Sequence, residues 1–267
     1  MAVTATAGMR TRSWFLPIAG LLTGTAWIAL FLWEESPYGR YLDHGSWTEI
    51  GLAGAICRAV PAGAVALPLL LYVGGWLLMT AAMMLPTTLP LLQRFQRLVE
   101  ARPERGQLIA LLIAGYLAAW AGFGVAAHLL DAALHAAALQ ADWLAANGPL
   151  IGAAVLMSAG LFQFSRLKYR CLDKCRTPLS FLAQHWHGPR PRRSSFRLGL
   201  DHGVFCVGCC WAIMLLMFVV GTGNVGWMLA LGAVMALEKN APWGRRLSQP
   251  LGATLLAAAG IVAGANL

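Results

Sequence analysis

Long apolar stretches alternate with short polar ones along the chain, and this pattern is its dominant feature. Seven stretches are apolar enough to form helices that cross a bilayer, whose hydrocarbon core requires about 20 residues. They cover residues 13–33, 66–92, 107–130, 148–165, 199–221, 225–238 and 248–266. The stretch at 225–238 is the shortest, so we expect it to be tilted or shielded by its neighbours. The pattern predicts an all-α, polytopic bundle of about seven transmembrane helices.

The composition favours the same class of protein. Hydrophobic residues make up 58% of the 267 residues, charged residues 12%, and the mean hydropathy is +0.63. Soluble domains carry about 25% charged residues. The basic N-terminal residues lead into a full-length apolar stretch with no small-residue cleavage site, so we expect the first helix to remain in the mature protein. No internal repeat or low-complexity tract divides the chain, which predicts one integral membrane domain over residues 1–267.

The basic residues predict the orientation. With a cytoplasmic N-terminus, Arg40 and Arg58 are the only ones of the 20 Lys and Arg residues that lie on the outer side. The positive-inside rule therefore predicts that the N-terminus is cytoplasmic. The same distribution accounts for the net charge of +9 without a nucleic-acid partner. We interpret the basic segments as orientation signals and as contacts with anionic lipid.

Two polar segments differ in character. Residues 34–64 form an outer segment with several Trp and Tyr residues at or near its start, which is typical of a membrane interface. Residues 166–198 are basic and interrupted by prolines, which predicts a solvated inner loop with short helices. Glu238 and Lys239 follow the short apolar stretch, and we expect them to form a helix end that faces water. A buried carboxylate at this position would instead be a candidate partner for an ion.

Sulfur-containing residues gather in the stretch "DHGVFCVGCCWAIMLLM" at 201–217. At about 100° per residue, His202, Cys206, Cys209 and Cys210 share one helix face. Met214 and Met217 extend the same donor set toward the other end of this helix. Thiolate, thioether and imidazole donors together select Cu(I) or zinc over hard cations. Packing alone is the alternative for isolated cysteines, but three within five residues favour metal ligation or redox chemistry.

A second group of soft donors lies in "GGWLLMTAAMMLPTTLPLL" at 74–92. Met79 and Met83 are one helical turn apart, and Met84 adjoins them. Pro86 and Pro90 predict a break in this helix. The methionines and the cysteine cluster are expected at similar depths in the bilayer, which favours one shared site.

A third group of soft donors, a pair of thiols, is predicted for the basic inner loop. Cys171 and Cys175 lie four residues apart in "LKYRCLDKCRTP". Such a pair can bind a metal ion or cycle between dithiol and disulfide. His185 and His187 are weaker candidates on the same loop.

A separate, weaker outer site is predicted at the end of the third stretch. His128, Asp131 and His135 stand at i, i+3 and i+7, which puts them on one helix face. Imidazole and carboxylate suit zinc or Cu(II). The alternative is a polar helix end that reaches water.

These motifs carry a resemblance to a known family. The stretches "GWLLMTAAMMLPTTLP", "LKYRCLDKCRTP", "GVFCVGCCWAIMLLMFVVGTGNVGWM" and "LEKNAPWG" occur in this order between residues 70 and 245. In order and spacing they resemble the bacterial family of predicted metal-binding integral membrane proteins known as domain-of-unknown-function family 2182. The resemblance implies a multi-span protein of the bacterial inner membrane with a metal site, and no established reaction. Gly223 stands where a methionine is expected in that family.

The sequence thus predicts a membrane protein that binds a soft transition metal, Cu(I) first and zinc second, for transport or delivery at the inner membrane. Its partners would be the lipid bilayer and a metallochaperone or the subunits of a copper enzyme. The alternatives are a membrane thiol-disulfide redox protein and an accessory subunit that assembles a copper enzyme. No nucleotide-binding loop or catalytic triad is visible, so an enzyme is the less favoured interpretation.

Overall fold

The computed structural model describes residues 15–34, 66–138, 140, 148–186, 189–220 and 225–265. These residues form ten α-helices and one 3-10 turn, and none of them is in a strand. The helices are α1 (Phe15–Glu34), α3 (Ala66–Met83), α4 (Leu89–Leu98), α5 (Arg105–Ala138), α7 (Gly148–Gln163), α8 (Arg166–Arg176), α9 (Pro178–His185), α10 (Pro191–Val220), α11 (Val225–Asn240) and α12 (Gly244–Ala265). The predicted all-α bundle is confirmed.

Each of the seven predicted apolar stretches is helical within the described residues. By length and composition, α5, α10 and α12 are each able to cross a membrane, and the number rises to five if two bent helix pairs count as one span each. Within α1, Gly20–Leu32 counts as a shorter apolar segment, and α11 has 16 residues. The figure of about seven spans therefore stays a prediction.

The predicted break at the prolines is present. The chain bends by 47° between α3 and α4, with the 3-10 turn η2 (Pro86–Thr88) at the corner. The amide groups of Met84 and Leu85 both donate to the carbonyl oxygen of Thr80, at 2.8 and 3.2 Å. Because proline cannot donate a backbone hydrogen bond, the helix ends here and Met84 is left at the corner.

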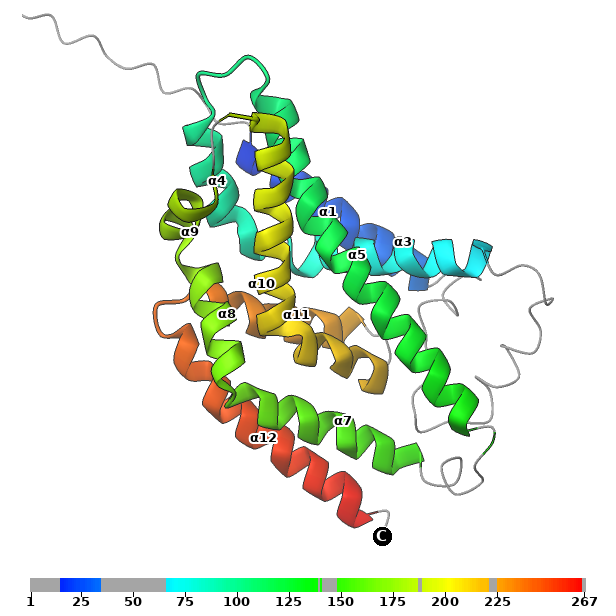
Figure 1. The fold of residues 1–267 in the computed structure, drawn as a ribbon. Coiled ribbons are helices and arrows are strands. Elements are labelled where there is room, and N and C mark those ends of the chain that lie inside the picture. The colour runs from blue at the N-terminus through cyan, green and yellow to red at the C-terminus, as the bar shows by residue number, and fades with distance from the viewer. Residues whose placement is uncertain are drawn as a thin grey trace, which may run out of the picture.

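The long helices α5 and α10 run side by side and form the central pair of the bundle (Figure 1). Glycine makes this contact close. A Cβ atom at Gly199 would lie 1.9 Å from the carbonyl oxygen of Leu112, and one at Gly115 would lie 2.0 Å from that of Phe196. Small residues at a crossing let two helix backbones approach, as is common between membrane helices. The pair α7 and α12 packs in a similar way through Gly160 and Gly252.

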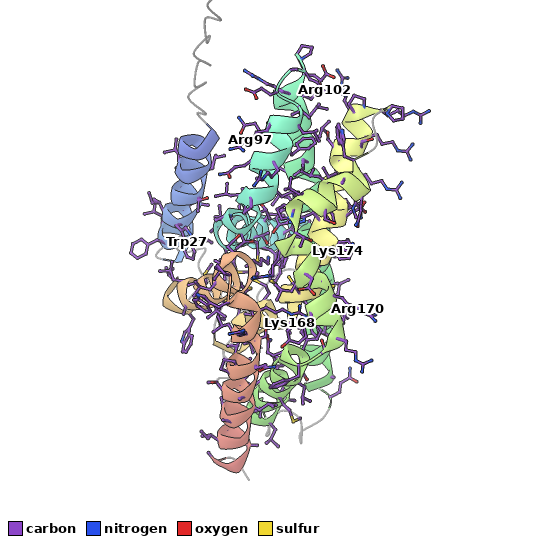
Figure 2. The ribbon with its side chains drawn as sticks, turned by 90° about the vertical axis from the view of Figure 1, so that its left-hand side faces the viewer. Trp27, Arg97, Arg102, Lys168, Arg170 and Lys174 are labelled. Carbon is purple, nitrogen blue, oxygen red and sulfur yellow. The ribbon has the colours of Figure 1, made fainter. Side chains whose placement is uncertain are left out.

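The predicted solvated loop at 166–198 is wrong in part. Helix α8 packs against α10, α9 packs against α4, and α10 begins at Pro191 rather than at 199. Lys168 of α8 is fully buried, while Arg170 and Lys174 point away from the core (Figure 2). Lys168, Cys171, Leu172 and Cys175 follow a helical i, i+3, i+4, i+7 spacing, so one face of α8 joins the core. The predicted outer segment at 34–64 lies outside the described residues apart from Glu34.

Candidate metal centre

The soft donors of α10 all face the interior. His202 is 2% exposed, and Cys206, Cys209, Cys210, Met214 and Met217 are each at most 1% exposed. The shared face expected from their spacing is therefore the face that packs in the core. Burial removes these sulfur atoms from water, so an ion bound among them would be held in a medium of low dielectric constant.

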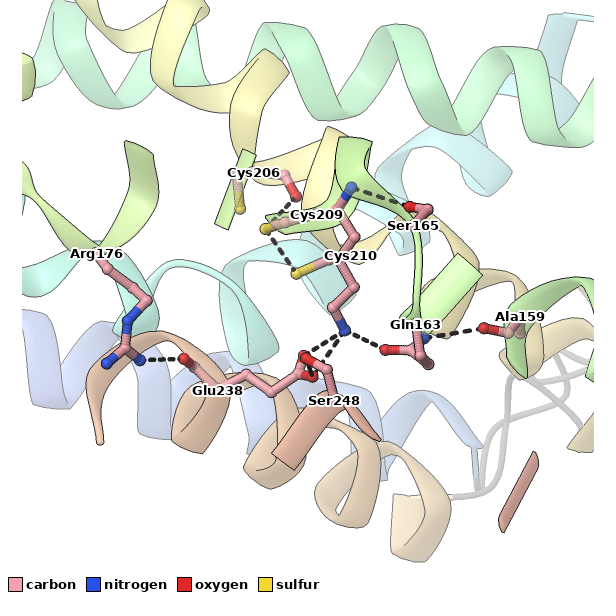
Figure 3. A network of polar contacts seen from close by, with 10 residues as sticks. Ala159, Gln163, Ser165, Arg176, Cys206, Cys209, Cys210, Glu238 and Ser248 are labelled. Carbon is pink, nitrogen blue, oxygen red and sulfur yellow. Dashed lines mark hydrogen bonds and ion pairs between the residues drawn. The ribbon is translucent and has the colours of Figure 1, made fainter. Parts of the chain in front are cut away.

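Helix α8 brings another thiol to this face. The Sγ atoms of Cys175 and Cys209 are 3.9 Å apart, and those of Cys209 and Cys210 are 3.3 Å apart. Two sulfur atoms on one ion, with bonds of about 2.3 Å, lie at most about 4.6 Å apart. The sulfur of Cys209 is thus close enough to share an ion with that of Cys175 and with that of Cys210. Cys209 at present donates to the carbonyl oxygen of Cys206, at 3.2 Å (Figure 3).

Cys171 lies beside the same cluster. It is buried, and a Cβ atom at Gly208 would stand 2.6 Å from its Sγ atom. Gly208 therefore provides the space in which α8 approaches α10. The pair Cys171 and Cys175, predicted on a solvated loop apart from the membrane site, instead belongs to the core around α10. Cys171, Cys175, Cys206, Cys209 and Cys210 are all free thiols.

Cys206 has the most polar surroundings of the cluster. Its Sγ atom lies 2.8 Å from Lys239 Nζ and 3.0 Å from the hydroxyl oxygen of Tyr116. Lys239 Nζ also donates to Thr87 Oγ1, at 3.2 Å, and lies 3.7 Å from Met84 Sδ. The expectation that Lys239 faces water is wrong, because its side chain reaches inward to two soft donors on facing helices. Neither Lys239 nor Tyr116 was identified from the sequence as part of the site.

The methionines of α3 and of the turn that follows it share this core. Met79, Met83 and Met84 are buried in the same cluster of side chains as the cysteines. Met228 and Met235 of α11 belong to it as well, although the sequence interpretation missed them. Their spacing of seven residues on the short apolar stretch was the available signal. The methionine groups supply weak, neutral donors around the thiols.

His202 is enclosed by aromatic rings. Its ring centre lies 5.2 Å from that of Phe181 and 6.0 Å from that of Tyr116. Its Nδ1 atom is buried and has no hydrogen-bond partner among the residues that the structure describes. A buried polar atom without a partner costs free energy, which a ligand would recover. His185 stacks on the same Phe181 ring at 4.1 Å, and the side chain of His187 lies outside the described residues.

The outer trio of His128, Asp131 and His135 is carried by α5, so its helical spacing is as expected. His128 is half-buried, and the side chains of the other two lie outside the described residues. A metal site at this end of α5 stays a prediction.

A buried ion pair adjoins the thiols. Lys168 Nζ lies 2.7 and 2.9 Å from the two carboxylate oxygens of Glu238 and also donates to Gln163. Ser248 donates to the same carboxylate at 2.6 Å, beside Gln163 and Glu238 in Figure 3. Glu238 is 1% exposed, so its expected place in water is wrong too. Its carboxylate is paired with Lys168, and this ion pair joins α8 to α11.

Arg176 makes a second link between these helices. Its guanidinium group donates to the carbonyl oxygen of Glu238, and to those of Ala241 and Pro242 at 2.8 and 3.1 Å. Carbonyl groups at the C-terminal end of a helix lack partners within the helix, and a cation is favourable there. Lys168 and Arg176 thus hold both ends of α8 against α11, with Cys171 and Cys175 between them.

No group of three or more His, Cys, Asp and Glu side chains among the described residues already has the arrangement of a metal site. The sulfur atoms of Cys175 and Cys210 both lie close to that of Cys209, and the methionines add neutral thioethers. Such a donor set suits a soft monovalent ion, which needs few ligands, better than zinc, which takes four.

A family model described as a copper chaperone, PpoB2, matches residues 73–262. The chain belongs to this family. The matched region runs from α3 into α12 and includes every described cysteine and the methionines of the core. No curated protein and no solved structure matches the chain. Membership of a copper chaperone family agrees with the association with copper that the sequence predicted.

Proposed function

We propose that this chain is a membrane copper chaperone, which takes up Cu(I) in the thiol cluster of α8 and α10 and passes it on at the bacterial inner membrane. The observation that carries the proposal is the position of the buried Cys209, whose Sγ atom lies 3.3 Å from that of Cys210 and 3.9 Å from that of Cys175. The copper chaperone family supports the cargo, and the apolar helices support a place in the membrane. The resemblance to domain-of-unknown-function family 2182 points to the same setting.

In this proposal the residues have different roles. Cys206, Cys209 and Cys210 hold the ion within the membrane, with His202 beside them. Cys175 is half-buried, whereas the other described cysteines are buried, so it is the thiol through which copper enters or leaves. Cys171 supports this transfer from the same helix.

The methionines act as relay ligands around these thiols. They are Met79, Met83, Met84, Met214 and Met217. Thioethers bind Cu(I) weakly and without charge, so they suit an ion that must leave as readily as it arrives. The partner would be a soluble copper carrier or the apoprotein of a copper enzyme.

Metal analysis of the purified, reduced protein tests the proposal. We expect about one Cu(I) per chain, and we expect Cys209→Ser to lose most of it because a thiolate with two sulfur neighbours is removed. Met79→Leu should weaken binding only modestly, because it removes one neutral donor. Equal losses in both variants would indicate a folding defect, and wild-type protein without affinity for Cu(I) would refute the proposal.

A second measurement separates copper binding from thiol-disulfide exchange. We expect stoichiometric Cu(I), and not Mg²⁺, to shield Cys206, Cys209 and Cys210 from a membrane-permeant alkylating reagent. Cys206 and Cys209 are three residues apart in a regular helix, where a disulfide would strain the turn. Mass spectrometry that found this disulfide in most molecules would favour the redox function instead.

A further inference from the structure

Lys239 has an unusual place for a lysine. It is 5% exposed, and its ammonium group meets three acceptors, from α10, from η2 and from the turn before η2: Cys206 Sγ at 2.8 Å, Thr87 Oγ1 at 3.2 Å and Met84 Sδ at 3.7 Å. An ammonium group has three N–H donors and no acceptor, so these contacts use its full capacity. The side chain is therefore held between a thiol of α10 and a thioether of the turn that follows α3.

The charge of Lys239 has no carboxylate partner. Glu238 is its neighbour in sequence but binds Lys168 and Ser248, and none of the acidic side chains in the described ranges forms an ion pair with Lys239. A buried charge requires a compensating partner. The closest atom is the sulfur of Cys206, which also contacts the Tyr116 hydroxyl. A fixed positive charge thus adjoins the thiols that we propose to bind copper.

A fixed cation acts differently on ions of different charge. Its repulsion of a nearby metal ion is proportional to the charge of that ion, so a divalent ion is repelled twice as strongly as a monovalent one. Screening by water and salt is weak in a buried site. Zinc accepts thiolate ligands too, so a number of ligands that favours Cu(I) does not by itself exclude Zn(II).

We propose that Lys239 is a specificity-determining residue, whose buried ammonium group beside Cys206 makes the site favour Cu(I) over Zn(II). The inference rests on the proposed function, because it assumes that copper binds at the thiol cluster. It adds the basis on which that cluster selects its cargo. Lys239 needs no direct bond to the ion, since the effect acts through charge at short range.

The test compares the affinities for Cu(I) and Zn(II) in one set of variants. Lys239→Met removes the charge at similar length, Lys239→Arg retains it, and Lys174→Met is the matched control near the surface, where Lys174 contacts Gln184 at 2.7 Å. Competition with chromophoric chelators, on reduced and anaerobic protein in detergent, gives each affinity. We expect the ratio of Cu(I) to Zn(II) affinity to fall at least tenfold in Lys239→Met and to stay unchanged in the other two variants.

A merely structural role for Lys239 would weaken both metals equally and leave the ratio unchanged, which would overturn the inference. Lys239→Gln, which keeps a polar group without charge, gives the same test if the methionine variant does not fold. If both uncharged variants fail to fold while Lys239→Arg folds, Lys239 has a structural role, and this result would overturn the inference as well. Wild-type protein that binds no Cu(I) would refute the proposed function itself, whereas wild-type binding with an unchanged ratio in Lys239→Met refutes this inference alone.

Discussion

Replacement of Lys168 by methionine should destabilise the protein strongly. Lys168 and Glu238 are 0% and 1% exposed, and their charged atoms are 2.7 Å apart. At this separation and an effective dielectric constant near 20, their attraction is about 6 kcal/mol, most of which offsets the cost of removing both groups from water. Lys168→Met leaves the carboxylate of Glu238 buried without a counter-charge, so we expect a loss of about 3–5 kcal/mol in the free energy of unfolding.

The double variant Lys168→Met with Glu238→Gln supplies the decisive comparison. It removes both charges, so we expect it to recover to within about 1 kcal/mol of the wild type, since no buried charge remains unpaired. Lys174→Met is the control, with an expected change below about 0.5 kcal/mol for a residue near the surface.

Equilibrium unfolding in detergent micelles, followed by circular dichroism, measures these differences. The single variant should also bind less copper, because α8 then holds Cys175 less firmly beside Cys209. A loss below about 1 kcal/mol in Lys168→Met would refute the reasoning. So would a double variant whose loss of stability equals the summed losses of Lys168→Met and Glu238→Gln, since either result means that the buried pair is not coupled.

Two further predictions concern the packing and the orientation. Gly199→Ala should destabilise the α5–α10 contact by about 2 kcal/mol or more, because the new Cβ atom would lie 1.9 Å from a backbone oxygen of Leu112. Gly122→Ala is the control: its new Cβ atom would have no atom within 4 Å, so thermal stability should change little. Single cysteines introduced at Arg102 and Arg193 should be protected in intact cells from an impermeant thiol reagent, and one introduced at Gln140 should react. The reverse labelling pattern would overturn the predicted orientation.

The hydropathy pattern was sufficient to predict the helices but not their partners. Each apolar stretch is helical, and the prolines at 86 and 90 mark a true bend, because both features depend on neighbouring residues alone. The buried states of Glu238 and Lys239 depend instead on Lys168, 70 residues from Glu238, and on Cys206, 33 residues from Lys239. Two adjacent charges at a helix end ordinarily face water, and no local pattern reveals such distant partners.

The candidate site was predicted more fully on α10 than on α8. Cys206, Cys209 and Cys210 share the face that their spacing predicts, because one regular helix carries all three. The basic residues and prolines of 166–198 concealed the fact that α8 is amphipathic. Its one buried face, with Lys168 and Cys171, follows helical spacing and was the signal that could have placed Cys175 beside the other thiols.

In the proposed chaperone, the close crossing of α5 and α10 bears on how copper would be released. Because Gly115 and Gly199 bring the two backbones into direct contact, the helix that carries three of the thiols is locked in rotation and translation against its neighbour. α8 is a third as long, and a 63° bend separates it from α7. The sulfur cluster therefore lies between α10, which is fixed by direct backbone contact, and α8, which is fixed by side-chain contacts at its two ends, and α8 carries the half-buried thiol.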